Sequence, residues 1–380
     1  MPRVGGPRQT GPMPPVSSPA LRAARIAAHG FRAPADRAAD VVDRLGAMQA
    51  QDLGAAKWAI GSRMAEPSMA AVDAALESRR VVRSWPMRGT LHVMPSRMLR
   101  PVLKITAPRV LAAARSRYEQ LELGEVEYRL ARDAAERLLT GGGSATRDEL
   151  AATWDAAGIR PEGQRAYHLI AWLARDGVLC CGPVDGRSQR FALLDEWAPA
   201  GVEEPTERDE TLGELFTAYI TGHGPVTIAD FAWWSGLTKA DAKIGLAVAG
   251  DRVEPFAGSD DRLVAAGSTD AASARPRGAL ALAAFDEYFL GYADRSPVCE
   301  PQYQDRVIPG RNGVFQPLLV LDGRVVGTWR RGGTTTKPRV ELRWFEPMPA
   351  GTTDRFTRPL ASWARFHGVE LHGLDHLVVA

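Results

Sequence analysis

The sequence of 380 residues predicts an α+β fold made of several modules. Between about residues 20 and 274, helical patterns followed by a short hairpin pattern occur three times. From about residue 275, strand patterns separated by turn signals dominate. Because helices followed by a hairpin are typical of a winged helix, we predict three tandem winged-helix modules and a C-terminal, mainly β domain. This organisation fits a chain that is long for one domain.

The module boundaries follow from these patterns and from composition. The first 19 residues are rich in Pro and Gly and lack the apolar stretch of a signal peptide, so they are predicted to be a disordered tail. Six acidic residues crowd between residues 201 and 214 and predict an exposed linker. The predicted modules are residues 20–118, residues 119–200, residues 201–274 with the acidic linker, and residues 275–380.

The first module shows four helical patterns before its hairpin, which is expected to turn at Pro86–Gly89. Its helices are predicted near Leu21–His29, Asp36–Met48, Leu53–Met64 and Ser68–Arg79, and its strands at Val81–Trp85 and Thr90–Val93.

The second and third modules carry clearer boundary signals. Thr146 and Glu149 have the spacing of a capping box, and Asp185-Gly186 is a strong hairpin turn signal. In the third module, Thr227–Asp230 is expected to cap a helix whose Trp233 and Trp234 belong to the core. The other predicted elements are helices near Glu125–Leu139, Gln164–Arg175 and Thr238–Val248, and strands at Val178–Cys181, Arg190–Leu194 and Arg252–Phe256.

The C-terminal domain is predicted from apolar stretches on either side of Asp322-Gly323, a hairpin signal. Asp286 and Arg295 are expected to form an ion pair in this domain, with a structural role favoured over a catalytic one. Its predicted elements are strands at Val314–Leu321, Val325–Arg330, Val340–Phe345 and Val369–Val379, and a helix at Asp354–Phe366.

The charge of the chain is nearly balanced in total but strongly biased in one region. The formal net charge is +2, yet residues 78–118 contain ten cationic residues and no Asp or Glu. A local basic surface attracts phosphates even when acids elsewhere cancel the total. Trp85 is expected either to wedge beside a base or to join the core. The predicted DNA contacts are Arg83, Trp85, Arg88, Arg97 and Arg100, with Arg330 and Arg331 on the β domain.

Composition argues against several classes of protein. Three cysteines make neither a disulfide framework nor a zinc motif, and no apolar run reaches the roughly 18 residues of a membrane span. We expect a cytoplasmic, nucleoid-associated protein that needs no metal or cofactor and does not bind membranes. No dimerisation helix is evident, so a monomer is expected.

A pair of glutamines lies just before the basic region, in Met48-Gln49-Ala50-Gln51-Asp52. An amide oxygen can accept a hydrogen bond from a water while the amide nitrogen donates elsewhere. On a helix, residues i and i+2 point about 200° apart, so Gln49 and Gln51 can cooperate only if the helix has ended nearby. Otherwise both are ordinary surface or capping residues. Asp52 is expected either to cap the next helix or to act as a base.

Thr90 and His92 lie on one face of the predicted hairpin, because alternate residues of a strand share a face. If that face lines a DNA-binding channel, both side chains are candidates to contact the damaged strand or the water. The alternative is that His92 is a packed or surface residue.

Several short motifs occur in one order along the chain. They are Gln49-Ala50-Gln51-Asp52, Met87-Arg88-Gly89-Thr90-Leu91-His92, Gly224-Pro225-Val226-Thr227 with Asp230-Phe231-Ala232-Trp233-Trp234, Phe285-Asp286-Glu287-Tyr288 running to Asp294-Arg295-Ser296, and residues 321–329. Together they resemble the AlkZ-type bacterial alkylpurine DNA glycosylases from about Leu21 to the C-terminus. The resemblance implies three winged helices around a C-terminal β-barrel, a concave channel for double-stranded DNA, and Gln49 and Gln51 as the catalytic pair. A sister group carries Gln-x-Asp at this place, so Gln51 places the chain on the AlkZ side.

The resemblance also implies excision of N7-alkylated purines and, in several members, unhooking of bulky natural-product adducts or interstrand crosslinks. An N7-alkylguanine already carries a positive charge, so it can leave without protonation, and the protein needs mainly to position a water and stabilise charge. A neutral amide accepts protons poorly, so we expect labile substrates and little action on undamaged DNA. Lys57 is the only lysine near the pair, which favours a monofunctional enzyme in which water attacks.

Two other classes of function remain open from the sequence. A non-catalytic winged-helix protein, such as a transcriptional regulator, reads its site with a recognition helix, often as a symmetric dimer. Three modules in one chain instead favour wrapping a single duplex. A nuclease needs clustered carboxylates to hold metals, and the acidic stretch at residues 201–214 lacks helical or strand patterning.

Overall fold

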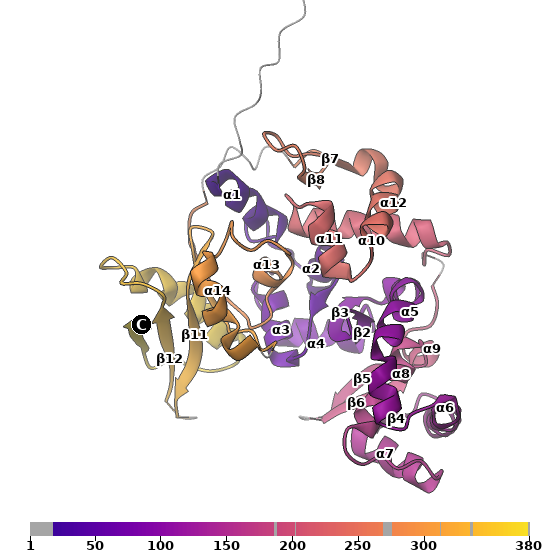
Figure 1. The fold of residues 1–380 in the computed structure, drawn as a ribbon. Coiled ribbons are helices and arrows are strands. Elements are labelled where there is room, and N and C mark those ends of the chain that lie inside the picture. Colours follow the sequence, from indigo (N-terminus) through magenta and orange to yellow (C-terminus); the bar gives the residue numbers. More distant parts are fainter. Residues whose placement is uncertain are drawn as a thin grey trace, which may run out of the picture.

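The computed structural model describes residues 18–185, 188–201, 203–268, 276–311, 313–334 and 337–378. Residues 1–17 of the predicted tail and the predicted turn residue Gly186 lie outside these ranges. The predicted boundary after residue 19 is wrong, because Ser18 and Pro19 already belong to the first helix. Helices and strands are both abundant, which confirms the α+β class (Figure 1). None of the described helices has the length and apolar character needed to cross a membrane.

The first part of the chain has four helices before its hairpin, as predicted. It contains α1 (Ser18–Ala28), α2 (Ala38–Leu45), β1 (Met48–Gln49), α3 (Leu53–Gly61), α4 (Met69–Glu77), β2 (Val81–Met87), β3 (Thr90–Pro95) and the long α5 (Ser96–Gln120).

The second and third parts repeat the order of helices followed by a hairpin. The capping boxes at Thr146 and Thr227 form as predicted. The elements of the second part are α6 (Glu125–Leu139), β4 (Ser144–Thr146), α7 (Arg147–Ala156), α8 (Arg165–Arg175), β5 (Leu179–Asp185), β6 (Ser188–Leu193) and α9 (Leu194–Trp197). Those of the third part are α10 (Arg208–His223), α11 (Ile228–Ser235), α12 (Lys239–Ala249), β7 (Val253–Pro255) and β8 (Leu263–Ala265).

The C-terminal part is built on a sheet with helices around it. Its elements are β9 (Ala279–Leu282), α13 (Glu287–Leu290), α14 (Pro301–Val307), β10 (Leu318–Leu321), β11 (Arg324–Gly333), β12 (Pro338–Trp344), α15 (Thr357–Phe366) and β13 (Leu374–Val378). The sheet has the order β13-β12-β11-β10-β9, with β13 parallel to β12. The described strands of the C-terminal part thus form an open sheet and not a closed barrel. The barrel-like and winged-helix descriptions stay predictions.

The hairpins of the first and second parts share one sheet, which was not predicted. Its strand order is β1-β3-β2-β5-β6-β4, and Arg83 of β2 lies opposite Cys181 of β5. The first two parts are therefore joined through a continuous set of strands.

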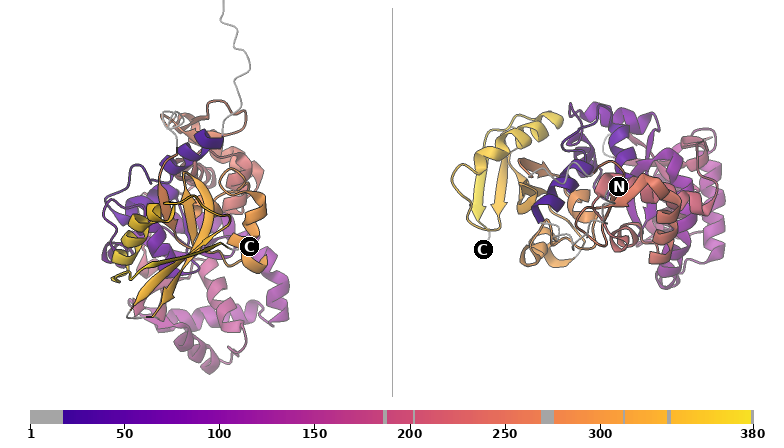
Figure 2. Two further views of the ribbon diagram at one scale, coloured as in Figure 1. Left: turned by 90° about the vertical axis from the view of Figure 1, so that its left-hand side faces the viewer. Right: turned by 90° about the horizontal axis from the view of Figure 1, so that it is seen from above.

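The first part also occupies the middle of the molecule, between the C-terminal sheet and the other helices (Figure 2). On one side, Trp58 packs with Trp329 and Trp363, and its Nε1 donates to the carbonyl of Ala281 at 2.9 Å. On the other side, Val82 and Met94 of the hairpin share a core with α10 and α11. The segment that carries the glutamine pair is consequently surrounded by contacts from several parts of the chain.

Two predictions from the acidic stretch and the C-terminal domain are wrong. Helix α10 begins at Arg208, so the last acids of the predicted linker belong to its first turns, where Asp209 and Glu210 face the positive end of the helix dipole. Asp286 does not pair with Arg295. It forms a bidentate ion pair with Arg63, at 2.7 and 2.9 Å, and both side chains are buried.

Candidate active site

The helix before the glutamine pair ends before either glutamine is reached. Helix α2 stops at Leu45, and Gly46 takes a left-handed backbone with φ of 74°. The chain then becomes extended, with Met48 opposite Val93 and Gln49 opposite His92. Strand β1 ends at Gln49, and Gln51 lies in a bend before α3. The condition that the helix ends before the pair is therefore met.

Both glutamine side chains are anchored to the same hairpin. The Oε1 atom of Gln49 accepts a hydrogen bond from Arg88 Nη2 at 3.2 Å, and the Oε1 atom of Gln51 accepts one from the backbone N–H of Leu91 at 2.7 Å. Gln49 is buried and Gln51 is exposed. Each amide oxygen has two lone pairs, so each can still accept a hydrogen bond from a water.

The backbone between the glutamines is held by Arg83. Its guanidinium donates to the carbonyl of Ala50 at 2.9 and 2.8 Å, to the carbonyl of Gln51 at 3.3 Å, and to Gln189 Oε1 at 2.9 Å. Arg83 is buried, and these acceptors take up its donors. It therefore serves to fix the segment that carries the two glutamines, and we do not propose it as a phosphate contact.

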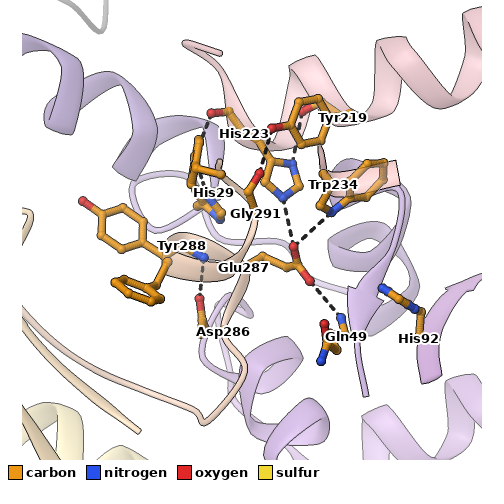
Figure 3. A network of polar contacts seen from close by, with 12 residues as sticks. His29, Gln49, His92, Tyr219, His223, Trp234, Asp286, Glu287, Tyr288 and Gly291 are labelled. Carbon is orange, nitrogen blue, oxygen red and sulfur yellow. Dashed lines mark hydrogen bonds and ion pairs between the residues drawn. The ribbon is translucent and has the colours of Figure 1, made fainter. Parts of the chain in front are cut away.

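A buried carboxylate, Glu287, lies beside the backbone of Gln49 (Figure 3). It accepts hydrogen bonds from the backbone N–H of Gln49 at 2.8 Å and from Trp234 Nε1 at 3.1 Å, and it contacts His223 Nε2 at 3.4 Å. Burial acts to raise the pKa of Glu287, but the contact with His223 and the Gln49 N–H outweigh it and hold the pKa below its ordinary value. Strand β1 is thus tied to a negative charge from the C-terminal part.

His92 is fully buried next to Arg88. Its Nδ1 lies 3.0 Å from the carbonyl of Thr90, which can only accept, so Nδ1 carries the proton. Its Nε2 then accepts from Arg88 Nη2 at 3.4 Å. Burial, together with the positive charge of Arg88, lowers the pKa of His92 to about 4. These contacts suit a role in holding Arg88 and leave His92 poorly suited to take a proton from a water.

Asp52 caps helix α3, as one of the two readings of the sequence predicted. Its side chain accepts a hydrogen bond from the backbone N–H of Ala55 at 3.0 Å. Thr90 is partly exposed and donates to the carbonyl of Met87 at 3.3 Å. Because the Asp52 carboxylate already stabilises a helix start, we assign it no part in activating water.

The chain is similar to known proteins in both sequence and structure. The match to the family described as "DNA glycosylase AlkZ-like" extends over residues 42–366, which is most of the chain. The chain belongs to the AlkZ-like DNA glycosylase family. A curated relative, "Interstrand DNA cross-link repair glycosylase" from Streptomyces sahachiroi, is 29% identical over 306 residues, covering 77% of this chain and 81% of the relative. The solved structure of Streptomyces sahachiroi DNA glycosylase AlkZ superposes with a TM-score of 0.76 at 26% identity, covering 96% of this chain and 100% of that one.

The protein is therefore a DNA glycosylase, and its substrate is DNA. Among the residues described above, no group of three or more His, Cys, Asp or Glu side chains is arranged to hold a metal ion.

Several of the predicted DNA contacts of this AlkZ-like glycosylase are already paired with acids. The basic region contains no acidic residue of its own, but acidic residues of other elements lie next to it in the fold. Arg97 lies 3.1 Å from Asp43, and Arg100 contacts Asp195 at 2.8 Å and Glu204 at 3.3 Å. The remaining predicted contacts are Arg330, which pairs with Glu341 at 2.8 Å, Arg331, which is exposed, and Trp85, which is buried in the core of the second part.

The supporting role of several residues around the site of the glycosylase was not predicted from the sequence. Glu287, Arg63 and His223 come from three separate parts of the chain, so no local pattern joins them. One signal was available: Phe285-Asp286-Glu287-Tyr288 places two adjacent acids between aromatic residues, and buried acids need partners.

The low pKa of His92 predicts a pH dependence of folding stability. The folded pKa of about 4 lies below the ordinary value of 6.5, so the unfolded chain binds more protons between these limits. The stabilisation that neutral His92 gives to the folded state is fully present above pH 6.5. As the pH falls toward 4, the free energy of unfolding decreases by about 3 kcal/mol in total. Urea unfolding of the native enzyme and of His92→Gln at pH 7 and pH 5 checks this. The variant should lose less stability on acidification, and equal losses would contradict the assignment.

Proposed function

We propose that this glycosylase is monofunctional and hydrolyses the N-glycosidic bond of cationic N7-alkylpurines in duplex DNA, with a water positioned by Gln49 and Gln51. The observation that carries the proposal is the shared anchoring of the two amides. They lie two residues apart between α2 and α3, and residues of one hairpin donate hydrogen bonds to the oxygens of both.

The chemistry suits neutral side chains. In the proposed step, the bond between C1′ and N9 breaks, and its electron pair moves to N9 and neutralises the positive charge of the alkylated base. Water oxygen bonds to C1′, and the second product is an abasic site after the water loses a proton to solvent. Positive charge develops on the sugar in between. No acid is needed for the leaving group, so orientation of the water is the main contribution of the protein.

The two glutamines differ in their surroundings, and we propose different roles for them. The cationic guanidinium of Arg88 withdraws electron density from the Gln49 oxygen, so Gln49 is the weaker acceptor and the better donor. The Gln51 oxygen faces only a neutral backbone N–H and is more exposed. Gln51 therefore accepts the hydrogen bond from the attacking water, and Gln49 orients that water or the sugar through its amide nitrogen.

The size of the adduct is part of the proposal. The name of the curated relative states repair of interstrand DNA crosslinks. We extend the proposed substrates of this enzyme to bulky N7 adducts and crosslinks, and we propose that it acts as a monomer.

A base-release assay tests the proposed function. A duplex that carries one N7-methylguanine is expected to yield free 7-methylguanine, measured by chromatography and mass spectrometry, whereas the undamaged duplex yields no free guanine. Addition of EDTA is expected to leave the rate unchanged, since no step uses a metal. Equal release from damaged and undamaged DNA, or loss of activity with the chelator, would overturn the proposal.

A further inference from the structure

Trp233 is the one residue of its pair that reaches the surface. Trp234 is fully buried, as predicted for both, whereas Trp233 is 36% exposed. Two guanidinium groups lie against its ring. The Cζ atom of Arg88 is 4.9 Å from the ring centroid, and that of Arg295 is 4.8 Å from it. Arg88 comes from the turn of the β2–β3 hairpin and Arg295 from the C-terminal part, so three parts of the chain meet here.

The two cations contact the same ring, yet neither forms an ion pair with a carboxylate among the described residues. Arg88 Nη2 contacts Gln49 and His92, and Arg295 Nε donates to the carbonyl of Phe289 at 3.0 Å. Glu287 lies near enough to favour the charge of Arg88, but its oxygens are taken by other donors. Arg88 Nε is buried without a hydrogen-bond partner among the described residues.

This arrangement costs free energy in the absence of an anion. Burial lowers the pKa of Arg88, and burial followed by repulsion from Arg88 lowers the pKa of Arg295. Arg97 and Arg100, in contrast, have acidic partners. A bound anion would offset the desolvation and the repulsion of the two guanidinium groups.

The backbone conformation of Arg88 indicates that its side chain has a specific role at this position. Its φ is 54°, in the left-handed region that Gly or Asn adopts most easily. Opposite it, a Cβ on Gly236 would lie only 3.1 Å from Arg88 Cγ, so the absence of a side chain there leaves room for the arginine. A strained conformation that persists in a bulky residue points to a function for its side chain.

We propose that Arg88 and Arg295, supported by the ring of Trp233, bind one phosphate of the DNA backbone beside the nucleotide whose base is released. Guanidinium groups match phosphate oxygens in shape and charge. Placing that nucleotide at Gln49 rests on the proposed function. Because Arg88 also contacts the Gln49 oxygen at 3.2 Å, phosphate binding would set the position of the catalytic amide relative to the strand.

The dependence of DNA binding on salt tests this site. Fluorescence anisotropy of a duplex with a stable tetrahydrofuran abasic analogue gives Kd between 50 and 200 mM NaCl without any base release. Arg88→Gln and Arg295→Gln are each expected to weaken binding severalfold. The double variant should lower the slope of log Kd against log salt by about 0.9, the value for one phosphate. Arg252→Gln removes a charge already paired with Glu214 and should leave the slope unchanged.

Two results of this experiment would overturn the proposal, and a further variant separates charge from structure. An unchanged slope in the double variant, or a loss of about 1.8 that indicates two separate phosphates, would overturn the proposal. Arg295→Lys keeps the charge and should keep most of the slope, whereas a loss equal to that of Arg295→Gln would show a purely structural role. Since the assay measures binding alone, the phosphate site can fail while release of 7-methylguanine continues, and the reverse also holds.

Discussion

Replacing both Gln49 and Gln51 with alanine is expected to lower the single-turnover rate constant for 7-methylguanine release by about 10³-fold. In the proposed mechanism the variant has no amide to position the water, so the alkylated base must leave with only bulk solvent to assist. Each single variant should lose about 10²-fold, because two groups that position one water act as a unit and their effects do not add. Quenched time courses with enzyme in excess measure these rate constants.

The comparison needs a glutamine that lies outside the site. Gln302 on α14 is exposed and contacts Glu300, so Gln302→Ala should excise at the native rate. Binding of the abasic-analogue duplex by the double variant should stay within about threefold of the native enzyme, since neither glutamine carries charge. A double variant that excises at the native rate would show that the water is held by other groups.

Asp286→Ala is expected to lower the free energy of unfolding by about 3–5 kcal/mol, the largest stability effect predicted for a single substitution here. The change leaves Arg63, whose side chain is only 1% exposed, as an unpaired charge in the interior. It also removes the acceptor of the Tyr288 backbone N–H at the start of α13, the helix that carries Glu287. Urea unfolding followed by circular dichroism measures the loss.

An exposed ion pair provides the matched control for this substitution. Glu214 pairs with Arg252, but the two side chains are 45% and 43% exposed, so Glu214→Ala should cost no more than about 1 kcal/mol. Combining Asp286→Ala with Arg63→Met removes the unpaired charge and should recover part of the loss. Equal costs for the buried and exposed pairs would contradict the account.

Local signals in the sequence predicted many elements correctly because they act over a few residues. The capping boxes at Thr146 and Thr227 and the cap at Asp52 all form. Helix α5 was missed because Pro101 and Pro108 lie inside it, and a proline usually ends a helix. The shared six-stranded sheet was missed because the pairing of Arg83 with Cys181 joins strands almost a hundred residues apart.

In the candidate site, too, local features could be predicted from the sequence and long-range contacts could not. The Gln-x-Gln element and its need for a broken helix could be derived from spacing alone, and α2 does end before it. The partners of the basic residues could not be derived, since Arg97 and Arg100 meet their acids only in the folded chain. Likewise, Asp286 was assigned the nearby Arg295 as partner, whereas tertiary packing selects Arg63.

The hydrogen bond from the Gln49 backbone to Glu287 has a consequence for biosynthesis. The two residues are 238 positions apart, so a ribosome adds Gln49 long before it adds the carboxylate that accepts from its backbone N–H. A partly synthesised chain therefore carries the basic hairpin but lacks the acceptor of the Gln49 backbone N–H. We therefore expect the Gln49 backbone to take its final position only after the C-terminal part has been synthesised and has folded against it.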